Sequence, residues 1–161
     1  MRKSKESMYS VPMMQKLSYL QYLYKSFSYC FENYKDYPAI LKFVNFKKKI
    51  SFDKSLIINP ITVQHGSIKS SSFIINKTIA YLPDVNMIYK KDFKKLSNLN
   101  YLIIDCLRYK KHPSHFNLDE VLELNTKLKP KKMILTNLHS DLDYNQLLNI
   151  LPKNIKPAYD G

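Results

Sequence analysis

The sequence predicts an α/β fold with a β-rich first half and alternating helices and strands in the second half. Three observations support this: short runs of β-branched and aromatic residues between positions 42 and 82, two apolar runs of the buried-strand type after position 100, and a helical pattern between those two runs. The chain has 161 residues, of which 45% are hydrophobic, and this suffices for a core. We therefore expect a single domain over residues 1–161.

The first segment is predicted to be helical. Between residues 17 and 31, apolar residues recur at mixed three- and four-residue spacing, which is typical of a helix that packs on one face. The polar start leads into no long apolar segment, and no run approaches the roughly 18 apolar residues of a membrane span. Cys30 and Cys106 lack C-x-x-C spacing and are consistent with reduced thiols. We expect a cytoplasmic protein with no membrane partner.

Between residues 42 and 82 the sequence predicts an antiparallel meander. The expected strands cover residues 43–46, 50–52, 56–58, 61–63, 72–75 and 78–82. Asn76 and Lys77 form a two-residue turn between the last two strands, because asparagine tolerates a positive φ.

After Asp84, helices and strands alternate. We expect helices over residues 92–96, 117–128 and 143–150, and buried strands over residues 101–105 and 133–136. Asn117 and Glu120 have the spacing of a capping box at the start of the second helix, and Asp143 is a candidate N-cap for the third.

The formal net charge of +13 suits an anionic partner. Among the 26 basic residues only Arg2 and Arg108 are arginines, although arginine is favoured for base-specific and bidentate phosphate contacts. AT-rich codon usage would give the same excess of lysine. A basic surface fits an anionic small substrate. It also fits the alternative function, a stand-alone nucleic-acid-binding module that uses the lysines at residues 47–49, 90–91 and 129–132.

All four histidines fall between positions 65 and 139, at the ends of predicted strands or in the loops beyond them: His65, His112, His115 and His139. Asp84 follows another predicted strand, and strand ends of an α/β sheet converge on the edge where ligands bind. Imidazole and carboxylate are ligands of divalent metals such as zinc. Taken singly, each residue has an ordinary explanation as a satisfied polar group or a turn cap. Spacing alone leaves both a metal or catalytic site and this explanation open.

Seven runs of residues carry a more specific signal. They are residues 63–66 (Val-Gln-His-Gly), 72–75 (Ser-Phe-Ile-Ile), 80–85 (Ala-Tyr-Leu-Pro-Asp-Val), 105–109 (Asp-Cys-Leu-Arg-Tyr), 112–116 (His-Pro-Ser-His-Phe), 135–144 (Leu-Thr-Asn-Leu-His-Ser-Asp-Leu-Asp-Tyr) and 157–161 (Pro-Ala-Tyr-Asp-Gly). Together they resemble metallo-β-lactamase-fold hydrolases, and most closely the branch of phosphoribosyl cyclic phosphate phosphodiesterases, which is related to tRNA 3′-processing ribonucleases. The resemblance covers the chain from about residue 17 onward and implies the C-terminal half of the family's αββα sandwich.

The resemblance implies a role for each candidate residue. His65 would be a terminal metal ligand, Asp84 the carboxylate that bridges two metals, and His139 the last metal ligand. His115, with His112 beside it, would act next to the scissile phosphoester as general acid or substrate contact. The metals, zinc or manganese, would activate water and neutralise charge on the phosphoryl oxygens.

Two departures from the family pattern change this expectation. Asn137 stands where many relatives have the histidine of a Leu-Thr-His run, and we expect His139 to take over that ligand role. The hallmark His-x-His-x-Asp-His motif does not occur, and no histidine precedes His65. We therefore expect a truncated phosphodiesterase-like hydrolase that binds metal weakly or not at all and is inactive alone.

The missing motif also predicts partners. Metallo-β-lactamase folds pack two sheets face to face, so this half alone would expose an apolar sheet face. We expect a separately encoded N-terminal half or self-association to cover that face, and an anionic phosphoester as the substrate of the completed site. A metal-free enzyme that uses His112 or His115 with Asp105 is disfavoured, because no activated nucleophile accompanies these residues.

Overall fold

The structure consists of two units, Met1–Asn45 and Phe46–Gly161. The computed structural model describes residues 21–42, 49–52 and 55–160 of the chain. The prediction of a single domain over residues 1–161 stays a prediction.

The described part of the first unit is helical at its start. Residues 21–26 form a helix, and α2 (Ser28–Phe31) follows after a turn at Phe27. This confirms the described part of the helix expected over residues 17–31. Only Cys30 is buried among the described residues of this unit, so the expected packing on one face is not seen within that part of the chain.

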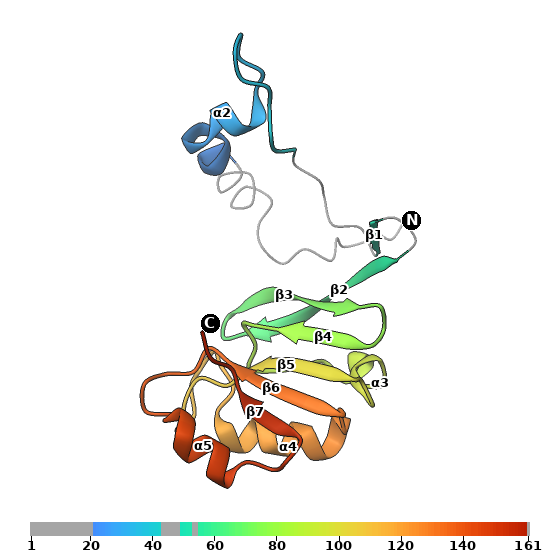
Figure 1. Ribbon diagram of the computed structural model, residues 1–161, viewed down its shortest axis with the longest axis vertical. Helices are drawn as coiled ribbons and strands as arrows, with labels where there is room; N and C mark the ends of the chain where they lie inside the picture. Colours follow the sequence, from blue (N-terminus) through green and yellow to red (C-terminus); the bar gives the residue numbers. More distant parts are fainter. Residues whose placement is uncertain (1–20, 43–48, 53–54, 161) are drawn as a thin grey trace, which may run out of the picture. The chain divides into compact units, whose positions relative to one another are not determined.

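The second unit is built on one seven-stranded sheet, in which the strands follow one another in chain order (Figure 1). The strands are β1 (Ile50–Phe52), β2 (Leu56–His65), β3 (Ile68–Ile75), β4 (Ile79–Leu82), β5 (Tyr101–Asp105), β6 (Lys132–Thr136) and β7 (Ile155–Pro157). Neighbours from β1 to β4 pair antiparallel, and neighbours from β4 to β7 pair parallel. The predicted α/β class and its division into a β-rich and an alternating part are confirmed.

The boundaries of several strands differ from the prediction. β2 is one strand of 10 residues, where the sequence predicted two short strands separated by Asn59 and Pro60. Proline fits because β1 pairs only with residues 56–58 of β2, which leaves Pro60 on an edge of the sheet. β3 begins at Ile68 rather than at residue 72, and β7 has no recognisable signal in the sequence. The strand expected over residues 43–46 lies outside the described residues.

Helices connect the parallel strands. They are η1 (Lys90–Asp92), α3 (Phe93–Leu96), α4 (Leu118–Leu128) and α5 (Tyr144–Ile150). The predicted capping box is present: the Asn117 side chain accepts from the Glu120 backbone N–H at 2.9 Å, and the Glu120 carboxylate accepts from the Asn117 N–H at 3.0 Å. Asp143 caps α5 by accepting from the Gln146 N–H at 2.8 Å, as predicted. Because β4 to β7 follow one another in one direction, right-handed crossovers place these helices on the same face of the sheet.

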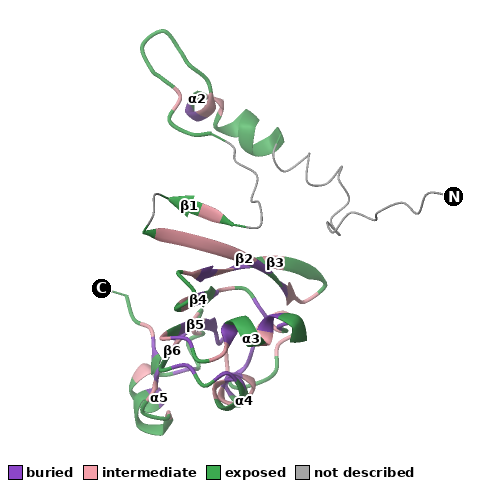
Figure 2. Ribbon diagram, turned by 90° about the vertical axis from the view of Figure 1, so that its right-hand side faces the viewer, coloured by how far each residue is buried: buried purple, intermediate pink, exposed green. Residues whose placement is uncertain are grey.

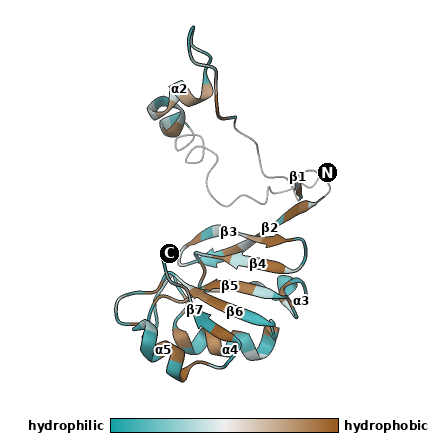
Figure 3. Ribbon diagram, viewed as in Figure 1, coloured by the Kyte–Doolittle hydropathy of each residue, from teal (hydrophilic) through white to brown (hydrophobic). Residues whose placement is uncertain are grey.

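Buried and more exposed residues alternate along β4, β5 and β6 (Figure 2), so the two faces of the sheet are buried to different extents. On the helix-covered face, Leu102, Ile104, Met133 and Leu135 are fully buried. Residues that alternate with them in β4, β5 and β6 stay partly or largely exposed; we call these the open face: Ile79, Tyr81, Tyr101, Ile103, Lys132 and Ile134. Most of them are apolar, and β5 and β6 are hydrophobic along much of their length (Figure 3). Within the second unit, the expected uncovered apolar face is present.

The two faces should respond differently to truncation. We expect Leu135→Ala to lower the free energy of unfolding by about 2–5 kcal/mol, because it leaves a cavity in a closed core. Ile134→Ala, one residue away on the open face, should lower it by no more than about 1 kcal/mol. Urea unfolding of the two variants measures both values. Equal losses would mean that Ile134 is covered.

Candidate metal site

One edge of the sheet collects the ends of four strands. β4, β5 and β6 run parallel, so their carboxyl ends lie together. β2 is antiparallel to β3, which is antiparallel to β4, and β2 therefore ends at the same edge. His65 is the last residue of β2, Asp84 comes two residues after β4, and Asp105 is the last residue of β5. The predicted convergence of strand ends is thus present.

Three of the predicted site residues come together at this edge. One potential ligand atom from each of His65, Asp84 and His115 lies within 4.8 Å of the other two. The rings of His65 and His115 meet edge to face, with centroids 4.7 Å apart and an interplanar angle of 78°. Both histidines are partly buried and Asp84 is exposed, so the group opens to solvent on the carboxylate side.

Both histidine rings are held through the same nitrogen. His65 Nδ1 lies 2.7 Å from the backbone oxygen of Ser114, and His115 Nδ1 lies 2.5 Å from Oδ2 of Asp105. A carbonyl or carboxylate oxygen can only accept, so each Nδ1 carries the proton and donates it. In the neutral ring, Nε2 then keeps a free lone pair. The hydrogen bonds therefore leave each histidine with one nitrogen for a ligand.

Asp105 is fully buried beneath this group. Burial raises the pKa of its carboxyl group to about 6, although hydrogen bonds from His115 and from the Val85 N–H, the latter at 3.2 Å, act in the opposite direction. Oδ1 of Asp105 makes no hydrogen bond of normal geometry among the described residues. Asp105 thus accepts both hydrogen bonds through one oxygen, which joins the loop after β4 to the loop that carries His115.

His112 lies beside this group. Its ring centroid is 5.1 Å from that of His115, and its Nδ1 lies 3.2 Å from the Ser114 hydroxyl. Partial burial lowers the pKa of His112, and the positive charge of Arg108 lowers it further. Arg108 donates through Nε and Nη2 to the backbone oxygens of Lys110 and Lys111, at 3.2 and 2.9 Å. The guanidinium therefore shapes the loop that presents His112.

The turn after β2 packs against the same loop. Gly66 has a φ of 60°, and a Cβ on it would lie 3.0 Å from the Cβ of Ser114. The Gly66 N–H donates to Oδ1 of Asn86 at 3.0 Å, and Nδ2 of Asn86 donates to the Pro113 oxygen at 2.9 Å. Sequence reasoning gave no role to Asn86 or Ser114. Only the position of Asn86 two residues after Asp84 could have drawn attention to it.

His139 lies outside the group of three. Its side chain is 59% exposed, and its Nδ1 lies 3.0 Å from Oδ1 of Asp141. Asn137, at the position where a histidine was expected, has a φ of 59° and donates through Nδ2 to the Pro83 oxygen at 2.6 Å. The amide thus ties the loop after β6 to the residue before Asp84. The ligand role of His139 stays a prediction.

Fold and site together define the class of this protein. A β-lactamase superfamily domain model matches residues 1–137, which is most of the chain. The chain belongs to the metallo-β-lactamase-fold hydrolases, and the resemblance inferred from its sequence is confirmed. This family is metal-dependent, in agreement with the cluster of His65, Asp84 and His115.

Solved structures extend the comparison. A diphosphatase of the PhnP family is 27% identical with a TM-score of 0.76, and the match covers 88% of this chain and 53% of the diphosphatase. YhfI from Bacillus subtilis, a metallo-β-lactamase-fold protein, is 15% identical with a TM-score of 0.64, over 92% of this chain and 70% of YhfI. The short form of human tRNase Z is 15% identical with a TM-score of 0.55, over 70% of this chain and 44% of that enzyme.

The chain therefore spans about half the length of the PhnP-family diphosphatase that it matches. Comparison with curated protein sequences gives no match. None of the helices formed by the described residues has the length and apolar character needed to cross a membrane.

The packing of Gly66 gives a test of the loop arrangement. Alanine at this position must adopt a left-handed φ and push against Ser114, so Gly66→Ala should lower the free energy of unfolding by about 1–2 kcal/mol. Ser67→Ala, at the neighbouring exposed position, is the matched control and should change it by no more than about 0.5 kcal/mol. Urea unfolding measures both. An unchanged Gly66→Ala would contradict the close packing of the turn on the loop.

Proposed function

We propose that this chain is the C-terminal part of a metal-dependent, phosphodiesterase-like hydrolase, which becomes active only when a separate N-terminal half supplies the His-x-His-x-Asp-His ligands. The observation that carries this proposal is the convergence of His65, Asp84 and His115 at one sheet edge. The 27% identity to a PhnP-family diphosphatase, over 53% of that protein, supports the same reaction class.

The residues present suit one divalent ion. Two imidazole nitrogens and a carboxylate are ligands that zinc and manganese accept. The described residues gather no second group of this kind, so a two-metal site requires ligands from elsewhere. When bound, the metal supplies activation of water and neutralises charge on the phosphoryl oxygens. His139 stays our candidate for a further ligand of the completed site.

The chain's own residues would handle the proton and the substrate charge. In the completed site, the doubly protonated ring of His115 would give its Nε2 proton to the leaving oxygen and become neutral, while the Asp105 carboxylate stabilises the charged ring and holds it through Nδ1–H. His112, whose pKa is lowered by partial burial and by the charge of Arg108, would contact the phosphoester. Arg108 and the neighbouring lysines at residues 110 and 111 would attract the anionic substrate.

The open face supports the need for a partner. Ile103 and Ile134 point away from the helix-covered core, and Tyr81 is 40% exposed. A sheet with one such face is stable when another layer packs on it. We propose that the N-terminal half provides that layer, with a second copy of this chain as the alternative occupant.

Complementation tests this function. The purified chain with zinc or manganese should not hydrolyse bis(p-nitrophenyl) phosphate, because its metal shell is incomplete. Mixing it with the separately expressed N-terminal half of the PhnP-family diphosphatase should give a co-eluting complex with phosphodiesterase turnover. His115→Ala should lower that turnover by about 10²–10⁴-fold.

The N-terminal half alone is the control. Turnover by this chain without a partner would contradict the inactive state, and a co-eluting complex without turnover would contradict the half-enzyme proposal.

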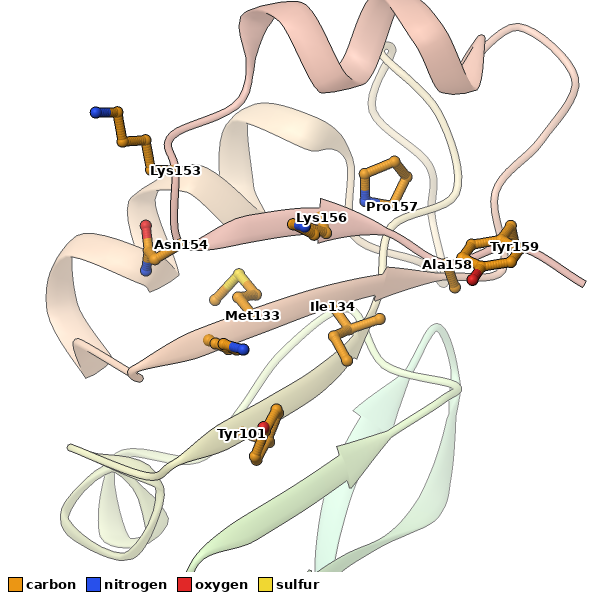
Figure 4. Close-up of a pocket in the computed structure, with 10 residues that line it drawn as sticks. Tyr101, Met133, Ile134, Lys153, Asn154, Lys156, Pro157, Ala158 and Tyr159 are labelled. Carbon is orange, nitrogen blue, oxygen red and sulfur yellow. The ribbon is translucent and has the colours of Figure 1, made fainter.

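A groove on the open face favours a second candidate function, binding of single-stranded nucleic acid. The groove has a volume of about 400 Å³ and lies along β5, β6 and β7 (Figure 4). Its lining includes three lysines and two tyrosines, Lys132, Lys153, Lys156, Tyr101 and Tyr159. Lys132 Nζ lies 5.8 Å from the ring centroid of Tyr101, so charge and stacking surface occur together. Of the lysines that the sequence suggested for this function, residues 47 and 48 lie outside the described part of the chain.

Salt dependence tests the second candidate. Fluorescence anisotropy with a labelled single-stranded oligonucleotide should show affinity that falls with salt. Lys132→Ala and Lys156→Ala should each reduce the slope of log K against log salt by about 0.7 for every phosphate that the variant no longer neutralises. His139→Ala, away from the groove, is the control and should bind like the wild type. No binding at low salt would remove this function.

A further inference from the structure

We propose that this chain alone binds one divalent transition-metal ion through Nε2 of His65, Nε2 of His115 and a carboxylate oxygen of Asp84. His115 is then a metal ligand in the isolated chain rather than a proton donor, and His139 takes no part. This inference rests on the proposed function, because it takes the site to be metal-dependent. It requires neither a partner protein nor catalytic turnover.

The donor atoms are close enough for one ion. Zinc lies about 2.0–2.2 Å from nitrogen and oxygen ligands, so two ligands of one tetrahedral ion are about 3.5 Å apart. One potential ligand atom from each of the three residues lies within 4.8 Å of the other two, so closing around an ion takes a movement of no more than about 1.3 Å. Asp84 can supply that movement because its side chain is exposed, whereas the two histidines are partly buried.

The surroundings of both histidines are those of metal ligands. A histidine that binds a metal usually donates its other ring N–H to a carboxylate or a backbone carbonyl, which fixes the ring and raises its basicity. His115 has the carboxylate of Asp105 as this partner, and His65 has the carbonyl of Ser114. Asp105 is fully buried, and its Oδ1 makes no hydrogen bond to any described residue. Its hydrogen bonds are those that Oδ2 accepts from His115 Nδ1 and from the Val85 N–H.

The other two histidines lack this arrangement. His112 Nδ1 faces the N–H and hydroxyl of Ser114 at 3.3 and 3.2 Å, and its donor atoms do not join the group of three. His139 is largely exposed and pairs with Asp141. The site therefore has two histidines and one carboxylate with open positions for solvent, a set that suits zinc, cobalt or ferrous iron.

Cobalt binding tests the inference, because Co(II) reports its own coordination through visible d–d absorption. Titration of the purified full chain should give a saturable band with one ion per chain. His65→Ala, Asp84→Asn and His115→Ala should each weaken cobalt binding at least about 10-fold, and Asp105→Asn should weaken it by about 10–100-fold through the His115 ring. His112→Ala and His139→Ala are matched histidine controls and should retain the wild-type cobalt affinity.

Circular dichroism and urea unfolding of every variant separate the loss of a ligand from the loss of folding. For a variant that does not fold, the ¹⁵N shifts of the histidine rings in the wild type give the same answer: only His65 and His115 should respond to zinc at Nε2.

Loss of binding in His139→Ala with retention in His115→Ala would overturn the inference, as would two ions per chain or no binding by the wild type. None of these results bears on complementation by an N-terminal half. Conversely, a complex without turnover would remove the half-enzyme function and leave this metal site in place.

Discussion

The buried carboxylate of Asp105 is the interaction on which the arrangement of the site depends. A carboxylate without solvent is costly, and the pKa raised to about 6 reflects that cost. One oxygen receives both compensating bonds, from His115 Nδ1 and from the Val85 N–H. Because Val85 follows Asp84, a single buried group positions the loops that carry the carboxylate and the second histidine. Asp105 is the last residue of β5, so the sheet fixes its position. The two hydrogen bonds that Asp105 accepts then fix the geometry of the site.

The open face links the two candidate functions, because both require the same surface. A second protein layer would bury Ile103 and Ile134 together with the lysine-lined groove, whereas a nucleic acid needs that groove accessible. The two uses therefore exclude each other on one molecule. Lysines at residues 132 and 156 stand on an otherwise apolar surface, and burying them against a partner requires acidic groups or solvent at the edge. The occupant of this face thus decides the function of the chain.

Sequence reasoning predicted the elements whose signals are local. β5, β6 and α4 were expected because their apolar runs and the Asn117–Glu120 capping box act over a few residues. It failed for β7, whose three residues form a strand only through pairing with β6. The same limit applies to the site. His65, Asp84 and His115 were predicted, but the bonds that fix their rings come from Ser114 and Asp105, and such tertiary partners leave no periodic pattern in the sequence.

One imidazole cannot serve as metal ligand and proton donor at the same time. Nδ1 of His115 is committed to Asp105, which leaves Nε2 as the single functional nitrogen. If Nε2 of His115 binds a metal in the isolated chain, it cannot carry the proton that the proposed reaction needs. An N-terminal half that supplies better ligands would release His115, because a metal exchanges a weak ligand for a stronger one. Completion of the metal shell and gain of the general acid would then be one event, so the isolated chain would lack both the full set of metal ligands and a free proton donor.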